Sequence, residues 1–258
     1  MGRYRVSKTL SRYGLKAIQP RSFVPRTTDS RHTYQISHNL LLDRNKPQKP
    51  NEVWVGDLTY IPLSGGNWCY LSVFMDLYSR RIIGWELQDN IKEQLACRTL
   101  SKAIRSRKIP KGLIIHTDRG GQYGGHKFRS IIHEKKMLHS MSLADNPYDN
   151  AFMESCFSRF KAELLQDGIF ETIEDAYTEI FKYIEMYYNT QRIHSSLGYQ
   201  SPHEFEKQFE KNCILDLHKQ GTMLYTEESP FIRRGIEPLP MKHKQEEPTL
   251  PKESALIL

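Results

Sequence analysis

The pattern of apolar and polar side chains predicts three strands in succession. From Glu52 to Pro62 the side chains alternate with a period of two, which is the spacing of a half-buried strand. Residues 68–75 and 81–87 form two more β-rich runs, and short turns separate the three runs. Because short connections join antiparallel neighbours, the three runs are predicted to form an antiparallel meander.

Helical and strand-like patterns then alternate. Residues 92–106 carry a helical apolar stripe and residues 112–116 (GLIIH) form a short buried strand, which gives the order β-β-β-α-β. Three further helices and one short strand are predicted at residues 127–136, 150–165, 172–188 and 138–142. The helix over residues 172–188 begins with a Thr172/Asp175 cap, and its apolar side chains recur at helical spacing, which favours core packing.

Prolines divide the chain into three regions. Residues 1–17 favour one short helix, and four prolines between positions 20 and 50 favour an extended linker after it. Beyond Asn212 the periodicity fades and five prolines interrupt the chain, which predicts a largely disordered tail. We therefore expect a basic N-terminal arm over residues 1–46, a folded core over residues 47–210 and a tail over residues 211–258.

The positive charge is concentrated at the N-terminus. The 258-residue chain has a formal net charge of +7, and residues 1–50 hold eleven Lys/Arg against two Asp/Glu. Such an arm is attracted to a polyanion such as nucleic acid through counterion release, although a solvated, solubilising linker has the same composition. A second basic stretch, residues 98–136, surrounds Asp118.

Two classes of protein are excluded by apolar runs and cysteine spacing. No run of about 18 apolar residues exists and the start lacks a secretory apolar region, so we expect a cytoplasmic protein that does not enter a membrane. The four cysteines lie far apart without CxxC or Cys/His ligand spacing, so we expect reduced, mostly buried thiols and neither a disulfide framework nor a zinc site.

Three carboxylates are the candidate catalytic groups. Asp57 lies within an otherwise apolar strand, on the face of Val55, and Asp118 directly follows the buried strand at residues 112–116. If the two strands are neighbours, these carboxylates converge. Glu154 lies near the start of a helix, and Lys161 follows two turns later on the same face. Three carboxylates suit a hard divalent cation, and two such ions promote phosphodiester displacement.

Each of these acids also has an ordinary structural explanation. Asp57 is also consistent with an acid at a strand edge, and Asp118 with a turn residue. Glu154 is also consistent with a negative charge that the helix dipole favours near the N-terminus of a helix. The residues that surround each acid in the sequence favour the catalytic interpretation. Three segments strongly resemble the transposases of bacterial insertion sequences of the IS-three family, in their OrfB half, and these segments are residues 54–61 (WVGDLTYI), 116–123 (HTDRGGQY) and 148–155 (YDNAFMES).

Two longer segments, residues 70–85 (YLSVFMDLYSRRIIGW) and 188–205 (YNTQRIHSSLGYQSPHEF), support the resemblance. It implies an RNase H-like α/β fold, with a mixed five-stranded sheet flanked by helices. It also implies that Asp57, Asp118 and Glu154 are the first, second and third catalytic acids and hold two Mg²⁺ or Mn²⁺ ions. The implied activity is metal-dependent DNA cleavage and strand transfer at the ends of an insertion sequence.

The resemblance further implies partners and a location. The partners are terminal-repeat DNA, target DNA and other copies of the chain in a homo-oligomer, together with an OrfA partner or fusion. The location is the bacterial cytoplasm, in association with the nucleoid. Two alternatives stay open: a general two-metal nuclease of the same fold, and a catalytically idle DNA-binding remnant or transposition inhibitor.

The chain departs from the family pattern without altering the acids. Gly56 stands where the family usually has Thr, and Ile193 where Pro is usual. Residues 4–20 resemble only the last helix of the helix-turn-helix region that normally precedes this core, so the start is expected to be truncated.

Several further residues are candidate DNA contacts, each with an alternative. Lys161 is expected to hold a phosphate, with a plain solvated lysine as the alternative. Arg119 begins a glycine-rich loop expected to be flexible and to let DNA approach, with a flexible surface loop without function as the alternative. Arg192 and His194 either contact the DNA backbone or cap the preceding helix. His116 shares the strand face of Asp118, where a packed histidine is favoured over a metal ligand because Mg²⁺ prefers oxygen.

Overall fold

A mixed five-stranded sheet forms the centre of the structure. The computed structural model describes residues 3–14, 33–42, 44–143, 151–165 and 168–223. The strand order is β3-β2-β1-β4-β5, with antiparallel pairing among the first three strands and parallel pairing of β1 with β4 and β4 with β5. The strands are β1 (Val53–Pro62), β2 (Trp68–Asp76), β3 (Ile82–Gln88), β4 (Ile114–Thr117) and β5 (Leu138–Met141). The predicted RNase H-like arrangement is confirmed.

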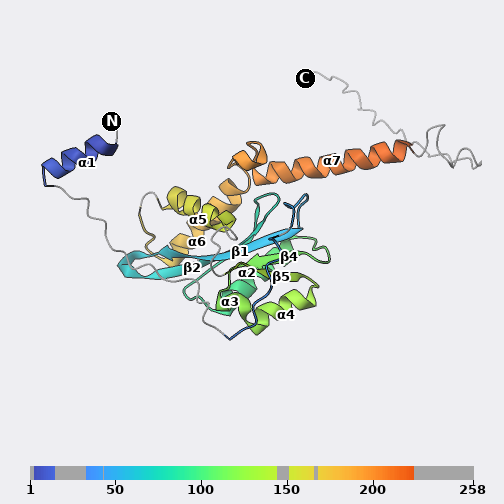
Figure 1. The fold of residues 1–258 in the computed structure, drawn as a ribbon, viewed down its shortest axis with the longest axis horizontal. Helices are drawn as coiled ribbons and strands as arrows, with labels where there is room; N and C mark the ends of the chain where they lie inside the picture. The colour runs from blue at the N-terminus through green and yellow to red at the C-terminus, as the bar shows by residue number, and fades with distance from the viewer. Residues whose placement is uncertain (1–2, 15–32, 43, 144–150, 166–167, 224–258) are drawn as a thin grey trace, which may run out of the picture. The chain divides into compact units, whose positions relative to one another are not determined.

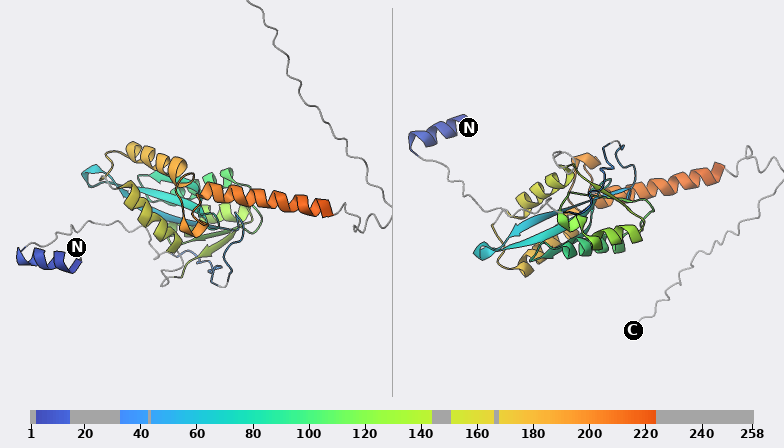
Figure 2. Two further views of the ribbon diagram at one scale, coloured as in Figure 1. Left: turned by 90° about the horizontal axis from the view of Figure 1, so that it is seen from above. Right: turned by 60° about the horizontal axis from the view of Figure 1, so that its bottom comes forward.

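Helices cover both faces of this sheet (Figures 1 and 2). One face packs against α2 (Glu93–Ser106), the short α3 (Gly121–Gly124) and α4 (His126–Glu134). The other packs against α5 (Ala151–Leu164), α6 (Ile173–Phe181) and the π-helical turn η3 (Lys182–Tyr188). Two apolar cores result, because alternate side chains of each strand point to opposite faces.

Strand β1 shows how this alternation divides the side chains. Val53 and Val55 belong to the core under α5 and α6, whereas Trp54 and Leu58 belong to the core under α2 and α4. Asp57, two residues after Val55, therefore faces the α5 side, as the period-two pattern predicts.

The helix predicted over residues 172–188 is correct at its start and incomplete at its end. The Thr172 side chain accepts a hydrogen bond from the Asp175 N–H and the Asp175 side chain accepts one from the Thr172 N–H, so the predicted cap is confirmed as a capping box. The α-helix ends at Phe181 and continues as η3. Tyr177 and Tyr187 are 43% and 42% exposed, so the prediction that the whole stripe is core was wrong for these two.

The prediction for the tail needs a correction. The tail over residues 211–258 was expected to be largely disordered, but its first part, residues 211–223, continues α7 (Pro202–Met223), and residues 224–258 lie outside the described residues. The five prolines that motivated the prediction all lie beyond Met223, outside the described residues. Chain contacts divide the protein into residues 1–207 and residues 208–258, so α7 begins in the first unit and ends in the second. The predicted N-terminal helix is present as α1 (Arg3–Arg12). No described helix is long and apolar enough to cross a membrane.

The glycine-rich segment after Asp118 is a folded element rather than a flexible loop. Gly121–Gly124 forms the short helix α3, and Gly120, Gly124 and Gly125 are buried. A Cβ on Gly125 would contact the Glu93 carboxylate, which also accepts a hydrogen bond from the Phe128 N–H at 3.0 Å. Gly125 therefore allows close packing against α2, and Gly120 leaves room for the Gln122 side chain.

Part of the basic arm contacts the core. The Leu40 N–H donates to the Ser140 hydroxyl at 2.9 Å, and Arg129 donates to the Gln35 carbonyl at 2.9 Å. Tyr34 packs edge-on against His126 with ring centroids 5.7 Å apart. Residues 33–42 therefore follow β5 and α4 without forming a helix or strand, in agreement with the predicted extended linker.

A test of the packing between the sheet and α2 is available at Gly84. A Cβ at this position would lie 2.8 Å from the Ala103 nitrogen and 2.8 Å from the Thr99 carbonyl oxygen, both backbone atoms that cannot rotate away. We expect Gly84→Ala to lower the free energy of unfolding by about 1–3 kcal/mol through overpacking, as measured by urea denaturation. The control is Gln94→Ala on the exposed side of α2, and equal midpoints for the two variants would contradict the packing described.

Candidate active site

The parallel pairing of β1 and β4 places two aspartates side by side. Gly56 pairs with Thr117 at the end of the ladder, and Asp57 and Asp118 are the next residues on the two strands. Both side chains are partly exposed. The Asp57 carboxylate accepts the Leu58 N–H at 2.7 Å, and the Asp118 carboxylate accepts the Gly120 N–H at 3.0 Å. The predicted convergence of these two acids is therefore confirmed by strand order and register.

A buried tyrosine lies close to both aspartates. Tyr123 of α3 is fully buried in the core beneath α2 and α4. Burial raises the pKa of its hydroxyl well above the usual value, and the negative charges of Asp118 and Asp57 raise it further. Neutral Tyr123 thus supports this edge of the sheet from the face opposite α5. Sequence reasoning missed this residue, whose only local signal was its place five residues after Asp118.

The third predicted acid lies on the helix that covers the same face. Met153, Phe157 and Phe160 are buried against the sheet, so α5 is fixed by one apolar stripe. Glu154, in the first turn, is exposed. Burial raises the pKa of Cys156, two residues after Glu154, to about 11. The negative charge of Asp57 on β1 contributes to this rise.

The carboxylates of this region are of the kind that binds a divalent metal, although the three acids do not lie together in one cluster. Asp57 and Asp118 present carboxylate oxygens at one edge of the sheet, which is what a hard cation such as Mg²⁺ binds. Within the described part of the chain, no three His, Cys, Asp or Glu side chains are close enough together to hold a metal ion. The structure therefore shows a two-aspartate half-site with Glu154 on the adjoining helix.

Gly56, where the family usually has Thr, is explained by its neighbour across the sheet. Phe74 on β2 pairs with Gly56, and a Cβ at position 56 would run into the Phe74 ring. The ring occupies the space that a side chain would take, so the departure is compensated locally and leaves Asp57 in register.

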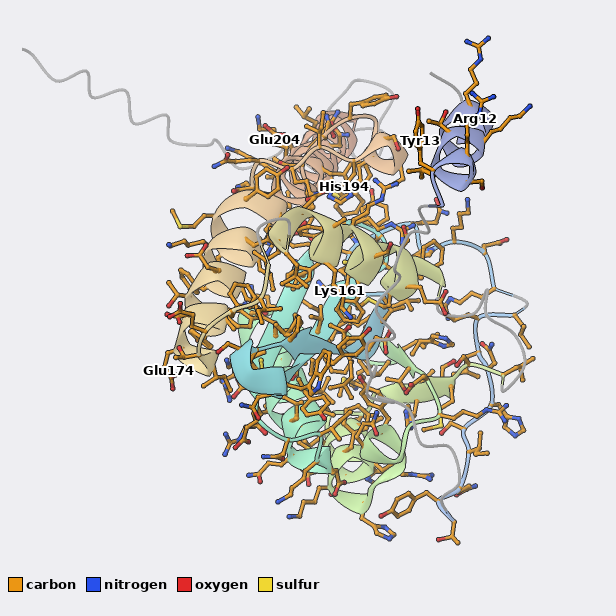
Figure 3. All side chains as sticks on the ribbon, turned by 90° about the vertical axis from the view of Figure 1, so that its left-hand side faces the viewer. Arg12, Tyr13, Lys161, Glu174, His194 and Glu204 are labelled. Carbon is orange, nitrogen blue, oxygen red and sulfur yellow. The ribbon has the colours of Figure 1, made fainter. Side chains whose placement is uncertain are left out.

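Lys161 lies on the same helix as Glu154 but at a different depth. Its ammonium group lies 3.5 Å from the centre of the Tyr60 ring, and burial lowers its pKa to about 8. Figure 3 shows Lys161 on the side of α5 that faces the sheet. Lys161 is therefore not a plain solvated lysine, and its half-buried cation stands beside β1.

The other predicted DNA contacts are largely engaged within the protein. Arg192 is buried and donates two hydrogen bonds from Nε and Nη2 to Glu163, the shorter at 2.7 Å. His194 packs edge-on against Tyr188, and Arg119 donates to the Ser142 carbonyl at 2.8 Å. These contacts hold the structure together. The Arg192 N–H also donates to the Tyr187 carbonyl at 2.9 Å in the last turn of η3, which is the capping considered for Arg192.

The predicted packed role of His116 is supported. It is fully buried on β4, and its Nδ1 lies 2.8 Å from the Ser140 hydroxyl of β5. The four cysteines are free thiols, of which Cys69 is buried, Cys97 and Cys156 are half-buried, and Cys213 is exposed. The expectation of mostly buried thiols was thus correct for one of them and too strong for Cys213.

The Arg192–Glu163 pair leads to a test of stability against pH. Hydrogen bonds from Arg192 lower the pKa of Glu163, so the pair stabilises the fold above the carboxylate's ordinary pKa and loses this effect as the pH falls through the lowered value. We expect Glu163→Gln to lower the free energy of unfolding at pH 7 by about 1–3 kcal/mol and to flatten its decline in acid. Urea denaturation at several pH values measures both effects. Glu179→Gln, whose ion pair with Lys182 is exposed, is the control and should change stability by less than about 0.5 kcal/mol.

Family comparisons agree with this geometry. Two family profiles, each described as an integrase core domain, match residues 47–147 and residues 135–202. The transposase for insertion sequence element IS904 of Lactococcus lactis is 45% identical over 66% of this chain and 66% of its own length. An insertion element IS600 protein of Shigella sonnei is 38% identical over 81% of this chain and 76% of its own. The transposase InsF for insertion sequence IS3A of Escherichia coli is 39% identical over 78% of this chain and 69% of its own length.

The fold also matches a solved integrase assembly. A chain of the simian T-cell lymphotropic virus intasome in complex with PP2A regulatory subunit B56 gamma superposes with a TM-score of 0.52 at 17% sequence identity. The match covers 70% of the present chain and 61% of the intasome chain. This likeness supports the sheet and its flanking helices. Because it has an integrase core domain and transposase relatives at 38–39% identity, the chain belongs to the IS-three family of insertion-sequence transposases, a family of DDE-type polynucleotidyl transferases.

Proposed function

We propose that this chain cleaves DNA at the ends of an insertion sequence and transfers the cut strand to target DNA, with Asp57, Asp118 and Glu154 as its catalytic acids. The observation that carries the proposal is the register of β1 and β4, which makes Asp57 and Asp118 neighbours at one edge of the sheet. Strand transfer in transposition is the activity of the family to which the chain belongs.

The three acids would hold Mg²⁺ or Mn²⁺, in a pair of ions. When bound, such ions stabilise both the attacking and the leaving oxygen of a phosphodiester displacement. Asp57 and Asp118 provide the rigid part of the site, because backbone hydrogen bonds fix both strands. Glu154 provides the third carboxylate from the first turn of α5, whose apolar stripe holds the helix against the sheet.

The proposed reaction needs no nucleophilic side chain. Water attacks one phosphodiester and releases a 3′-OH, and this hydroxyl attacks a second phosphodiester in line, so one P–O bond forms as another breaks in each step. The residues of the chain bind and orient the strands. Lys161 is a proposed phosphate contact, because its cation lies beside Tyr60 of β1, the strand that carries Asp57.

The proposed partners are terminal-repeat and target DNA, other copies of the chain on that DNA, and an OrfA partner or fusion. The eleven Lys/Arg of residues 1–50 favour DNA through counterion release. Residues 1–46 form the proposed basic arm, residues 47–210 the catalytic core, and residues 211–258 a C-terminal segment. The proposed location is the bacterial cytoplasm, in association with the nucleoid.

Loss of any one acid is expected to abolish joining. Asp57→Asn, Asp118→Asn and Glu154→Gln each remove a negative charge with little change in shape, and we expect strand transfer to fall by at least about 10²-fold. The assay uses labelled element-end DNA and target DNA in Mg²⁺, with and without OrfA. Glu174→Gln, an exposed acid at the start of α6, is the matched control and should keep full activity.

The outcomes separate the proposal from its alternatives. Cleavage without joined product would identify a nuclease of the same fold. DNA binding without cleavage or joining, even with OrfA present, would identify an idle DNA-binding protein. Joining that survives Glu154→Gln would remove Glu154 from the site.

Lys161 provides an independent pH test. Because its pKa is lowered to about 8, its positive charge is complete near pH 7 and is lost as the pH rises through 8. We expect the affinity of the protein for DNA to fall between about pH 7 and pH 9, and Lys161→Arg to flatten this fall because arginine stays charged. Fluorescence anisotropy with labelled DNA in EDTA measures the affinity. The same fall in both proteins would mean that Lys161 does not contact DNA.

A further inference from the structure

A polar cavity lies on the flank of α5 away from Lys161. Its volume is about 260 Å³. Phe152, Ser155, Cys156 and Arg159 line it from α5 at positions i, i+3, i+4 and i+7, which form one face of the helix. The other lining residues come from two more segments of the chain and are Met75, Arg80, Tyr188, Arg192, His194, Ser195 and Ser196. We call this cavity the arginine pocket.

Arg80 is held at the pocket by a strained turn. Its φ is +61°, a left-handed backbone conformation that residues other than glycine rarely adopt. The Arg80 N–H donates to the Asp76 carbonyl at 2.8 Å, and its carbonyl accepts the Tyr188 hydroxyl at 3.1 Å. The same turn is tied down by Ser79, whose hydroxyl donates to Glu206 at 2.7 Å. A residue kept in such a conformation at a polar cavity is a candidate functional group.

The Arg80 guanidinium forms no ion pair with a described residue, although the charge of Asp76 acts on it. It lies over the Phe152 ring, 4.2 Å from its centre, and burial lowers its pKa. A partly buried cation without a paired carboxylate is stabilised by a ligand that supplies negative charge. Arg159 is exposed on α5 and likewise makes no ion pair with a described residue.

The remaining polar groups of the pocket complete a site for an anion. Glu163 holds the Arg192 fork in place, and Arg192 Nη1 lies 3.4 Å from His194 Nε2. Burial and the positive charges of Arg192, Arg159 and Arg80 lower the pKa of His194 to about 4, and all four residues line the cavity. Ser155, Ser195 and Ser196 add hydroxyl donors around the same cavity.

We propose that the arginine pocket binds one phosphate of the DNA backbone, on the opposite flank of α5 from the carboxylate site. Arginine forks and serine hydroxyls are the groups that bind phosphate oxygens. The choice of DNA as the source of the phosphate rests on the proposed function. One face of α5 carries Glu154 and Lys161, and another carries the pocket residues, so DNA bound to both faces would be clamped across this helix. In Figure 3 His194 and Lys161 lie on opposite sides of α5.

The test measures how DNA affinity depends on salt. Labelled element-end DNA is titrated with the full chain in EDTA, from about 50 to 200 mM KCl, so that no chemistry occurs. We expect Arg159→Gln and Arg80→Gln each to weaken binding roughly threefold to tenfold and to reduce the slope of log K against log[salt] by up to about 0.9. Because both residues serve one phosphate, the double variant should lose about one unit of slope rather than two.

The matched control is Arg105→Gln, which removes the same charge from the exposed end of α2 on the other face of the sheet. It should leave affinity and slope unchanged. An equal loss in Arg105→Gln and Arg159→Gln would show an effect of net charge alone and would overturn the proposal. Arg159 is exposed, so its variant keeps the test valid if Arg80→Gln disturbs the turn, and thermal unfolding verifies the fold of each variant.

A second arm separates backbone phosphate from free phosphate. Inorganic phosphate is titrated into the wild-type protein and Arg159→Gln by calorimetry at constant ionic strength. Binding of inorganic phosphate that is lost in Arg159→Gln, together with unchanged DNA affinity in that variant, would identify a small-anion site and overturn the DNA assignment. Since the DNA arm contains no metal, the pocket can pass its test even if the strand-transfer variants contradict the proposed catalytic acids, and the reverse also holds.

Discussion

Parallel pairing between β1 and β4 is the constraint on which the rest of the protein depends. The two strands are 61 residues apart in sequence at their paired ends, Gly56 and Thr117. The antiparallel β2 and β3 extend the sheet on one side, and α2 crosses its face to return the chain in a parallel direction. Because strand ladders fix register to a single residue, the next side chains on each strand, Asp57 and Asp118, become neighbours.

Helix α5 uses three of its faces for different purposes. One apolar stripe of Met153, Phe157 and Phe160 attaches it to the sheet, which fixes where its polar side chains lie. Glu154 and Lys161, seven residues apart, share a second face, and the pocket residues that include Arg159 form a third. The helix therefore carries an acid and a lysine on one face and an exposed arginine on another, while Glu163 of the same helix pairs with Arg192.

Local sequence patterns determined the elements and the acids. Period-two alternation gave β1, and the Thr172/Asp175 pair gave the start of α6, because both signals arise from interactions within a few residues. Asp57, Asp118 and Glu154 could be selected because each lies in a short segment typical of the family. The predictions that were wrong depended on distant neighbours. The glycine segment after Asp118 packs against α2, and Tyr177 and Tyr187 remain partly exposed although their spacing is that of the buried stripe.

By itself, then, the sequence determined the strands, the helices and which carboxylates could act together, since these follow from side-chain periodicity and short motifs. The tertiary structure alone decided what lies around them. Tyr123 approaches both aspartates from the far face of the sheet, and Phe74 takes the space that Gly56 leaves empty. Arg80, Arg159 and Arg192 line one cavity from three separate segments. No local pattern encodes such a gathering, because it is produced by the packing of elements that lie far apart along the chain.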